Sequence, residues 1–266
     1  MVAIRGKNLR SGDLAEQLGI LLLQNLVLVS PVPRTEDVGI DVVATLLADL
    51  DKTRVLAEDS FFVQIKSSTI DKIEFNNHQI DWLYKLELPY FIATIERKSS
   101  TIKLFCCHRL LNALITNHQR KKIVIHFDDL ETTDEFVAKD NENVHIGPPV
   151  AEWSVSVLEE NEEFSKIFYQ LMKEHISIYK KNILWSRVGW VELCRWEINK
   201  KPNLFGRAGA ESRTFEESQQ VVEDALDPYL SKWLMNMQLE NHWSNTAESI
   251  FSLMSKVRKN ITGKEN

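Results

Sequence analysis

The sequence predicts an α/β protein in which a mixed central sheet is flanked by helices and followed by a mostly helical C-terminal extension. A hydrophobic fraction of 44% over 266 residues is enough to build a large core. Strand-like and helix-like segments alternate through the first part of the chain, and the pattern becomes mostly helical after Pro148 and Pro149. We therefore expect an α/β domain at residues 1–150 and a mostly helical region at residues 151–266.

A helix is expected first, and three strands are expected after it. Ser11 is a suitable N-cap, Asp13 lies in the first turn, and leucines recur at helical spacing up to about Asn25. The segment "LVLVSPV" predicts a short strand that ends at Pro31 and Pro33. The next two strands are expected at "GIDVVATLLA" and "SFFVQIKSS", and the polar turn "DLDKTR" follows the first of them.

The later elements continue this alternation before the chain becomes helical. Short helices are predicted at "NNHQIDWLYKLE" and "HRLLNALIT", and strands at "PYFIATIER", "TIKLFCC" and "KIVIHF". Longer helices are predicted at "EENEEFSKIFYQLMKEHISIYKK", "SRTFEESQQVVEDALDPYLSKWLMNMQL" and "AESIFSLMSKVRKN". Pro228 is expected to kink or split the second of these. The stretch "NKKPNLFGRAGAESR" is the most loop-like part of the chain.

Composition limits the classes of protein that fit. The formal net charge is −6, so any nucleic-acid surface must be a local basic patch. The three cysteines form no CxxC pair and the histidines lack a metal-binding spacing, so neither a disulfide framework nor a structural zinc site is expected. Cys106 and Cys107 are expected to be small core residues. The N-terminus lacks an apolar signal core and the longest apolar run is interrupted, which favours a cytoplasmic protein without membrane contact.

Three polar residues interrupt the predicted strand pair at "GIDVVATLLA" and "SFFVQIKSS". Gln64 and Lys66 flank Ile65 and share one face of their strand, and pairing as a hairpin would bring Asp41 close to both. Glu16, on the preceding helix, could approach the same corner. A carboxylate and an amide oxygen suit Mg²⁺, which would lower the pKa of a bound water and neutralise charge on a phosphate. Lys66 would position or deprotonate that water, or stabilise the extra negative charge at phosphorus.

The residues "DVGID" and "FFVQIKSS" resemble the motif of the PD-(D/E)XK nuclease superfamily, which has the restriction-endonuclease-like fold. The pattern is similar to the Mrr-like branches, in which Gln replaces the second acid. It is most similar to an uncharacterised bacterial branch with an Asp-x-Gly-Ile-Asp strand, a Gln-x-Lys strand and a glutamate on the first helix. Asp37 matches the first Asp of this pattern, and Ile40 stands where the superfamily often has Pro. The resemblance covers about residues 8–150.

The resemblance implies a restriction-endonuclease-like fold and an endonuclease that needs Mg²⁺, with Mn²⁺ as a substitute, and hydrolyses phosphodiester bonds in nucleic acid. It implies that Asp41, Gln64 and Glu16 belong to the metal site and that Lys66 is the catalytic lysine. DNA is expected as the substrate rather than RNA, and bacterial antiviral defence or restriction is the implied setting. A homodimer is attractive because cutting both strands of a duplex needs two sites. An ATPase or another defence-system protein is a further candidate partner. Residues 151–266 would recognise substrate, dimerise or dock a partner.

Each candidate residue also has an ordinary structural explanation. Glu16 could be a solvated residue of an amphipathic helix, and Asp41 could cap a turn after Gly39. Gln64 and Lys66 could form an exposed edge-strand face, where lysine is common.

A second hypothesis follows from the charge of the predicted site. A neutral Gln64 removes one negative charge from it, which weakens Mg²⁺ binding unless Glu16 or Asp37 compensates. The chain would then be a nuclease-fold binding or assembly subunit with weak or no catalysis that works with a partner protein. The basic segments at residues 97–103 and 118–122 fit either solvated faces or phosphate contacts.

Overall fold

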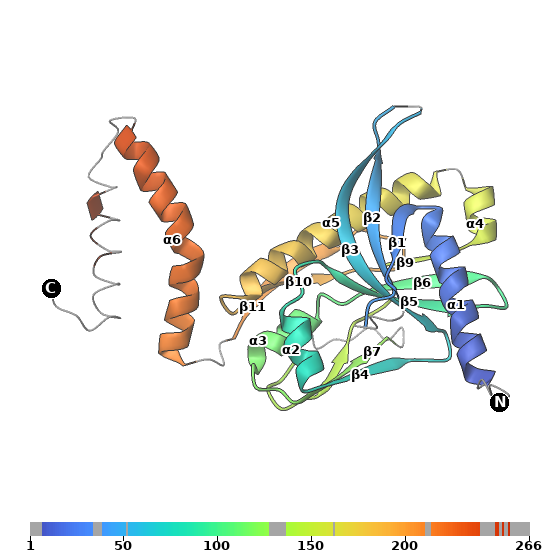
Figure 1. Ribbon diagram of the computed structural model, residues 1–266, viewed down its shortest axis with the longest axis horizontal. Coiled ribbons are helices and arrows are strands. Elements are labelled where there is room, and N and C mark those ends of the chain that lie inside the picture. The colour runs from blue at the N-terminus through green and yellow to red at the C-terminus, as the bar shows by residue number, and fades with distance from the viewer. Residues whose placement is uncertain are drawn as a thin grey trace. The chain divides into compact units, whose positions relative to one another are not determined.

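The computed structural model describes most of the chain and divides it into two units, residues 1–210 and residues 211–266. The described residues are 7–33, 39–51, 53–127, 137–161, 163–210, 214–239, 248, 249, 252 and 255. The first unit is a mixed α/β structure (Figure 1). Its helices and strands are, in order, α1 (Lys7–Gln24), β1 (Val27–Pro31), β2 (Val42–Asp49), β3 (Val55–Ser67), β4 (Lys72–Asn76), α2 (His78–Tyr84), β5 (Tyr90–Glu96), β6 (Thr101–Cys106), α3 (Leu110–Thr116), β7 (Lys122–His126), β8 (Asn143–His145), β9 (Ala151–Ser154), α4 (Val155–Glu160), α5 (Phe164–Ser186), β10 (Trp190–Arg195) and β11 (Asn203–Gly209).

The main sheet has six strands in the order β1-β2-β3-β5-β6-β9. Strands β3 and β5 are parallel, and the other neighbours in this sheet are antiparallel. Parallel neighbours need a crossover connection, and α2 lies in the segment that joins these two. All but the last residue of β5 are buried, as expected for a central strand covered on both faces. The expected mixed sheet with flanking helices is therefore confirmed. Smaller sheets are formed by β4-β7-β8 and by β10-β11.

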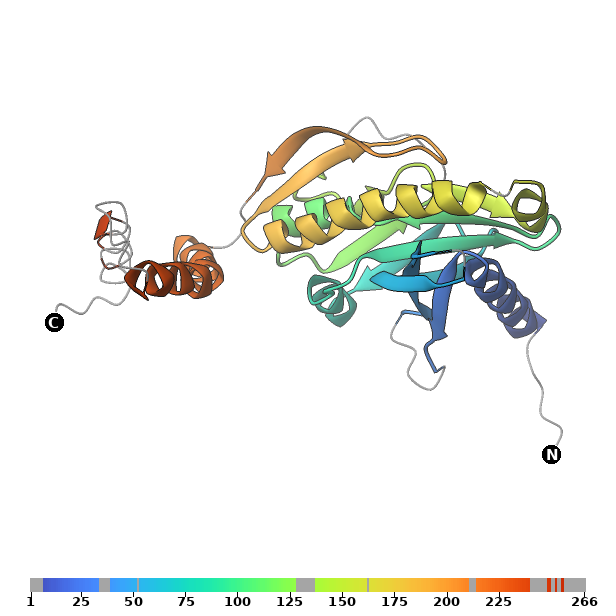
Figure 2. The same ribbon diagram turned by 90° about the horizontal axis from the view of Figure 1, so that it is seen from above.

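Two helices cover one face of the main sheet, which we call the helix face. Gly19 of α1 packs against Ile65 of β3 and Ile95 of β5, and the ring of Tyr179 in α5 lies 6.3 Å from the ring of Phe91. Ile95 and Phe91 point to the same side of β5 because side chains alternate along a strand. Figure 2 shows α5 passing over one side of the main sheet. Gln64 and Lys66, which flank Ile65, therefore belong to the opposite face, which we call the groove face.

The close approach of α1 to the sheet requires a glycine at position 19. A methyl group there would lie 2.8 Å from Cγ2 of Ile65, so we expect Gly19→Ala to lower the free energy of unfolding by about 1–2 kcal/mol. The matched variant is Gly12→Ala in the same helix, where an added Cβ meets nothing within 4 Å. That change should raise the free energy of unfolding by up to about 1 kcal/mol, because alanine favours helix. Urea unfolding of both variants measures the difference. If both substitutions changed the free energy of unfolding in the same direction, the close approach at Gly19 would be contradicted.

The structure differs from the expected division of the chain at residue 150. Strand β9 begins at Ala151 and pairs with β6, so it completes the main sheet. The ring of Trp153 in β9 lies 5.1 Å from the ring of Phe168 in α5, which joins that helix to the same core. The loop-like stretch at residues 199–213 contributes β11, which pairs with β10. The prolines at 148 and 149 therefore precede a strand of the first unit, and the chain divides after Ala210.

The described part of the second unit is helical. Helix α6 (Phe215–Leu239) begins with a reciprocal cap, in which the Thr214 N–H donates to the Glu217 side chain and the Glu217 N–H donates to the Thr214 hydroxyl. The helix includes Pro228 as a single element rather than two. Of the helix predicted at residues 247–260, the four described residues are helical. Within the described part of the chain, no helix is both long and apolar enough to span a bilayer.

Candidate functional site

Asp41 directly precedes β2, which lies between β1 and β3. Its backbone N–H donates to the carbonyl of Val63 at 3.0 Å, and its carbonyl accepts from the N–H of Val32 at 2.9 Å. Its carboxylate Oδ2 accepts the backbone N–H of Ile65 at 2.5 Å. Ile65 is the residue between Gln64 and Lys66, so this bond brings the carboxylate to the same stretch of β3. The same bond also gives Asp41 a structural role, because it satisfies an amide of β3.

Gln64 is buried and accepts a hydrogen bond from a buried tyrosine. Its side chain is 7% exposed, and its Oε1 accepts a hydrogen bond from the hydroxyl of Tyr90 at 2.6 Å. Tyr90 is fully buried at the start of β5 and is the residue beside Phe62 in the parallel register. Burial raises the pKa of the Tyr90 hydroxyl well above its usual value, and the charges of Cys107 and Asp41 raise it further. The hydroxyl is therefore a permanent donor that fixes the orientation of the Gln64 amide.

Tyr90 and Trp82 also belong to this site, although no motif in the sequence marks them. The Trp82 ring lies edge-on to the Tyr90 ring, with centroids 5.9 Å apart and an interplanar angle of 86°. The same tryptophan closes over Gly39, whose φ of +80° forms the turn that leads into Asp41. The signal available in the sequence was the segment "DWLYKLELPY", which shows that an aromatic helix face and a tyrosine-led strand follow the Gln-x-Lys strand. The contacts themselves depend on the parallel crossover.

Lys66 is half-buried on the groove face, beside a shallow cavity. One row of paired residues crosses four neighbouring strands of the sheet. It consists of Lys66 in β3, Thr94 in β5, Lys103 in β6 and Glu152 in β9. The last three of these residues line a cavity of about 530 Å³, which is a size typical of ligand sites. Asp71 also lines it, so acidic side chains outnumber lysine there.

Glu16 and Asp37 complete the set of predicted acids. Glu16 is half-buried in α1, one turn before Gly19. Because α1 packs on the helix face, Glu16 comes from the side of the sheet opposite to Gln64 and Lys66. Its role in a metal site stays a prediction. Asp37 lies outside the described residues.

One of the basic segments has a structural role. Arg120 is 7% exposed, and its guanidinium donates to the hydroxyl of Thr116 at 3.2 Å and to the carbonyl of Ala138 at 3.2 Å. Lys122, in the same segment, forms an ion pair of 3.1 Å with Glu74. Arg120 is therefore used inside the fold and is not a surface contact for phosphate.

Removal of the Tyr90 hydroxyl tests whether Gln64 depends on it. We expect Tyr90→Phe to lower the free energy of unfolding by about 1–2 kcal/mol, because Gln64 Oε1 would stay buried without its donor. Tyr229→Phe is the matched control, because that side chain is 74% exposed, and it should change stability by less than about 0.5 kcal/mol. Urea unfolding measures both variants. Equal stabilities of Tyr90→Phe and wild type would show that this hydrogen bond does not hold the amide.

No family model matches the chain, and no curated protein or solved structure matches it.

Proposed function

We propose that the protein is a metal-dependent nuclease of the restriction-endonuclease-like type, which hydrolyses phosphodiester bonds in DNA in preference to RNA. The observation that carries the proposal is the hydrogen bond from the Ile65 N–H to the Asp41 carboxylate. It sets the one acid of the predicted strand pair beside the Gln64–Lys66 stretch of the neighbouring strand. The element order begins with α1, then β1, β2, β3, β4, α2 and β5. Apart from the extra strand β4, this is the expected order of a helix, three strands, a helix and a further strand, and it supports the same fold type.

The donor atoms of Asp41 and Gln64 fit a hard divalent cation. A carboxylate and an amide oxygen are ligands that Mg²⁺ and Mn²⁺ accept. The bonds from Ile65 and Tyr90 use one lone pair of Asp41 Oδ2 and one of Gln64 Oε1, and both oxygens have a further lone pair. Asp41 and Gln64 would hold the ion, and Glu16 could add a second carboxylate only by reaching it from α1 on the helix face. When bound, such an ion lowers the pKa of a coordinated water and offsets charge on the phosphate.

The other residues have roles that follow from their places. Lys66 would hold the phosphate through its ammonium group and stabilise negative charge that develops at phosphorus. Tyr90 is a positioning residue, because its hydroxyl orients the Gln64 amide and is too buried to meet substrate. Lys103 lies farther along the groove face, beside Glu152 and in a cavity where acids outnumber lysine, so Lys66 rather than Lys103 would contact the phosphate. Each such phosphate contact makes binding weaker as the salt concentration rises.

The proposal is tested by incubating the full chain with plasmid DNA, linear DNA and RNA. Cutting is expected with Mg²⁺ or Mn²⁺ and should stop when EDTA is added. Lys66→Ala should remove most of the cutting, and Lys72→Ala is the matched control because Lys72 is exposed on β4. Cutting that continues in EDTA, or that survives Lys66→Ala, would overturn the assignment of this site.

A second candidate function is a nuclease-fold subunit that binds nucleic acid or a partner and cuts weakly or not at all. The specific observation that favours it is the buried Gln64, whose oxygen is already bonded to Tyr90. Binding of DNA or RNA without cutting of any substrate would favour this function. Because an enzyme that depends on a partner would also be inactive alone, co-purification from the native host should accompany the assay. Dimerisation and an ATPase or other defence-system partner are proposals of the same kind, tested by solution mass and by that co-purification.

A further inference from the structure

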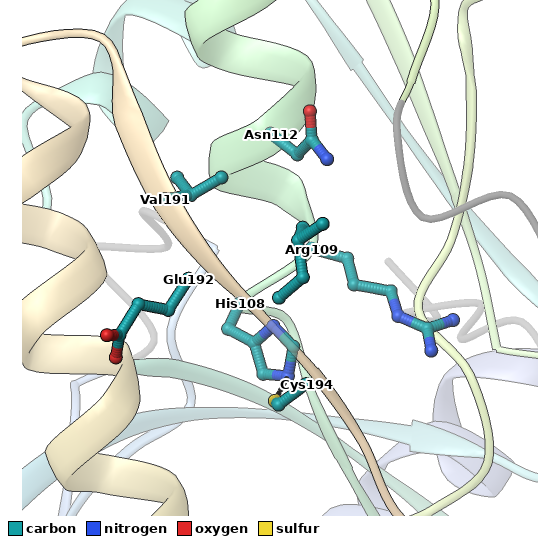
Figure 3. A pocket seen from close by; sticks show the side chains of 7 residues that line it. His108, Arg109, Asn112, Val191, Glu192 and Cys194 are labelled. Atoms are coloured by element: carbon teal, nitrogen blue, oxygen red, sulfur yellow. Dashed lines mark hydrogen bonds between the residues drawn. The ribbon is translucent and has the colours of Figure 1, made fainter. Parts of the chain in front are cut away.

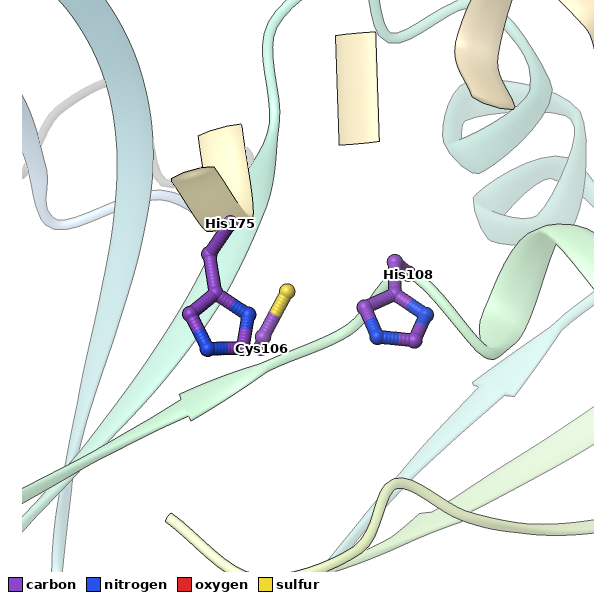
Figure 4. Close-up of side chains that lie close together, drawn as sticks. All are labelled: Cys106, His108 and His175. Carbon is purple, nitrogen blue, oxygen red and sulfur yellow. The ribbon is translucent and has the colours of Figure 1, made fainter. Parts of the chain in front are cut away.

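Cys106, His108 and His175 meet inside the first unit, away from Asp41 and Gln64, and Cys194 contacts one of them, His108. Cys106 ends β6, His108 follows two residues later, His175 lies in the middle of α5, and Cys194 lies in β10. The ligand atoms of Cys106, His108 and His175 all lie within 4.8 Å of one another, as Figure 4 illustrates. The Cys194 Sγ lies 3.0 Å from Nε2 of His108. None of the four is more than 3% exposed.

His175 is the unexplained member of this group. It is fully buried, and neither of its ring nitrogens has a hydrogen-bond partner among the described residues. Buried polar groups in native proteins nearly always have a partner, because an unsatisfied one costs about 1–3 kcal/mol. The neighbouring Trp196 does not supply one, because its ring meets the imidazole at 87° and its Nε1–H donates to the carbonyl of Pro148. A metal ion bound to His175 would satisfy one of these nitrogens.

The surroundings of the cluster suit an enclosed ion and no larger ligand. A cavity of about 10 Å³ adjoins it and is lined in part by His108 and Cys194 (Figure 3). That space holds about one water molecule and no organic substrate. Burial lowers the pKa of His175 to about 3, so its imidazole is neutral at physiological pH, the form that ligates metals. Burial raises the pKa of the Cys106 thiol, so binding an ion requires loss of its proton.

We propose that Cys106, His108, His175 and Cys194 bind one Zn²⁺ ion as a structural site. Closed zinc sites use four sulfur and nitrogen ligands in a tetrahedron, and two cysteines with two histidines is a common set. Bond lengths of about 2.3 Å to sulfur and 2.0–2.1 Å to nitrogen place tetrahedral ligand atoms about 3.3–3.8 Å apart. The ligand atoms of Cys106, His108 and His175, which lie within 4.8 Å of one another, would move closer on binding, and Cys194 would join the ion from its contact with His108. The ion would tie α5 and β10 to the end of β6. This proposal is independent of the nuclease proposal, because it shares no residue with that site.

The test measures metal in the full chain, purified without chelators from cells grown with added zinc. Elemental analysis is expected to find about one zinc per chain. Replacement of the zinc by Co²⁺ is expected to give a sulfur-to-cobalt charge-transfer absorption, which reports thiolate ligands. Cys106→Ser, Cys194→Ser and His175→Ala should each lower the zinc content at least severalfold.

Cys107→Ser is the matched control, because Cys107 is equally buried and adjacent to Cys106 but stands outside the cluster. It should keep about one zinc per chain. If the ligand variants do not fold, the wild-type protein decides the question alone. A wild-type chain without zinc that gives no cobalt–sulfur absorption would overturn the site, as would equal zinc contents in Cys106→Ser and Cys107→Ser.

Discussion

Asp41→Asn is expected to reduce Mg²⁺-dependent cleavage at least about 100-fold. Asparagine keeps an oxygen that can accept the Ile65 N–H, so the start of β2 should stay in place. The variant loses the negative charge that would bind the ion, and metal-assisted charge stabilisation contributes several kcal/mol, where about 2.7 kcal/mol corresponds to 100-fold in rate. Initial rates of plasmid cutting at several Mg²⁺ concentrations measure the effect.

Two companion variants separate a metal role from a structural one. Asp49→Asn removes an exposed acid at the other end of β2 and should cut at the wild-type rate. Asp41→Ala removes both the charge and the acceptor of the Ile65 N–H, so it should also lower the free energy of unfolding by about 1–3 kcal/mol. If Asp41→Asn cuts normally while Asp41→Ala is unstable, Asp41 only supports the strand pair.

Phe91→Ala is expected to lower the free energy of unfolding by about 3–5 kcal/mol, the largest stability effect that we predict. Phe91 is fully buried in the central strand β5, its ring lies 5.1 Å from the ring of Phe61 at 62°, and it also meets Tyr179 of α5. Truncation loses the transfer free energy of the ring and leaves a cavity that the sheet cannot close. Guanidinium unfolding, followed by tryptophan fluorescence, measures the change.

Phe205→Ala is the control for Phe91→Ala. Phe205 is 46% exposed in β11, with the guanidinium of Arg195 4.7 Å from its ring centroid. Such an exposed cation–π contact contributes about 0.5–1 kcal/mol, so Phe205→Ala should lower the free energy of unfolding by no more than that amount. Similar losses in the two variants would mean that the core is not organised around β5.

The strand pair of the candidate site was predictable because its information is local. The alternation in "FFVQIKSS" assigned Gln64 and Lys66 to one face, and the short connection after β2 made an antiparallel hairpin the natural pairing. The bond between Asp41 and the Ile65 N–H follows from that pairing. The position of Glu16 relative to the pair was harder to predict, because it depends on which face α1 covers.

The missed elements have non-local causes. The prolines at 148 and 149 suggested a boundary, yet β9 gains its stability by pairing with β6, about fifty residues earlier. Strand β11 lies in a stretch rich in glycine, asparagine and lysine, and it forms against β10. Local propensity is weak in such segments, so tertiary pairing decides their structure.

The sequence by itself determined the α/β class, the positions of α1, β2, β5, β6 and α5 within a few residues, and the pairing of Asp41 with the Gln-x-Lys strand. Each of these depends on hydrophobic periodicity or on a short connection. Only the tertiary structure decided that Tyr90 bonds to Gln64, and that Cys106, His108, His175 and Cys194 share one buried volume. The spacing of those four residues matches no metal motif, because the ligands come from different elements that meet only when α5 and β10 pack at the end of β6.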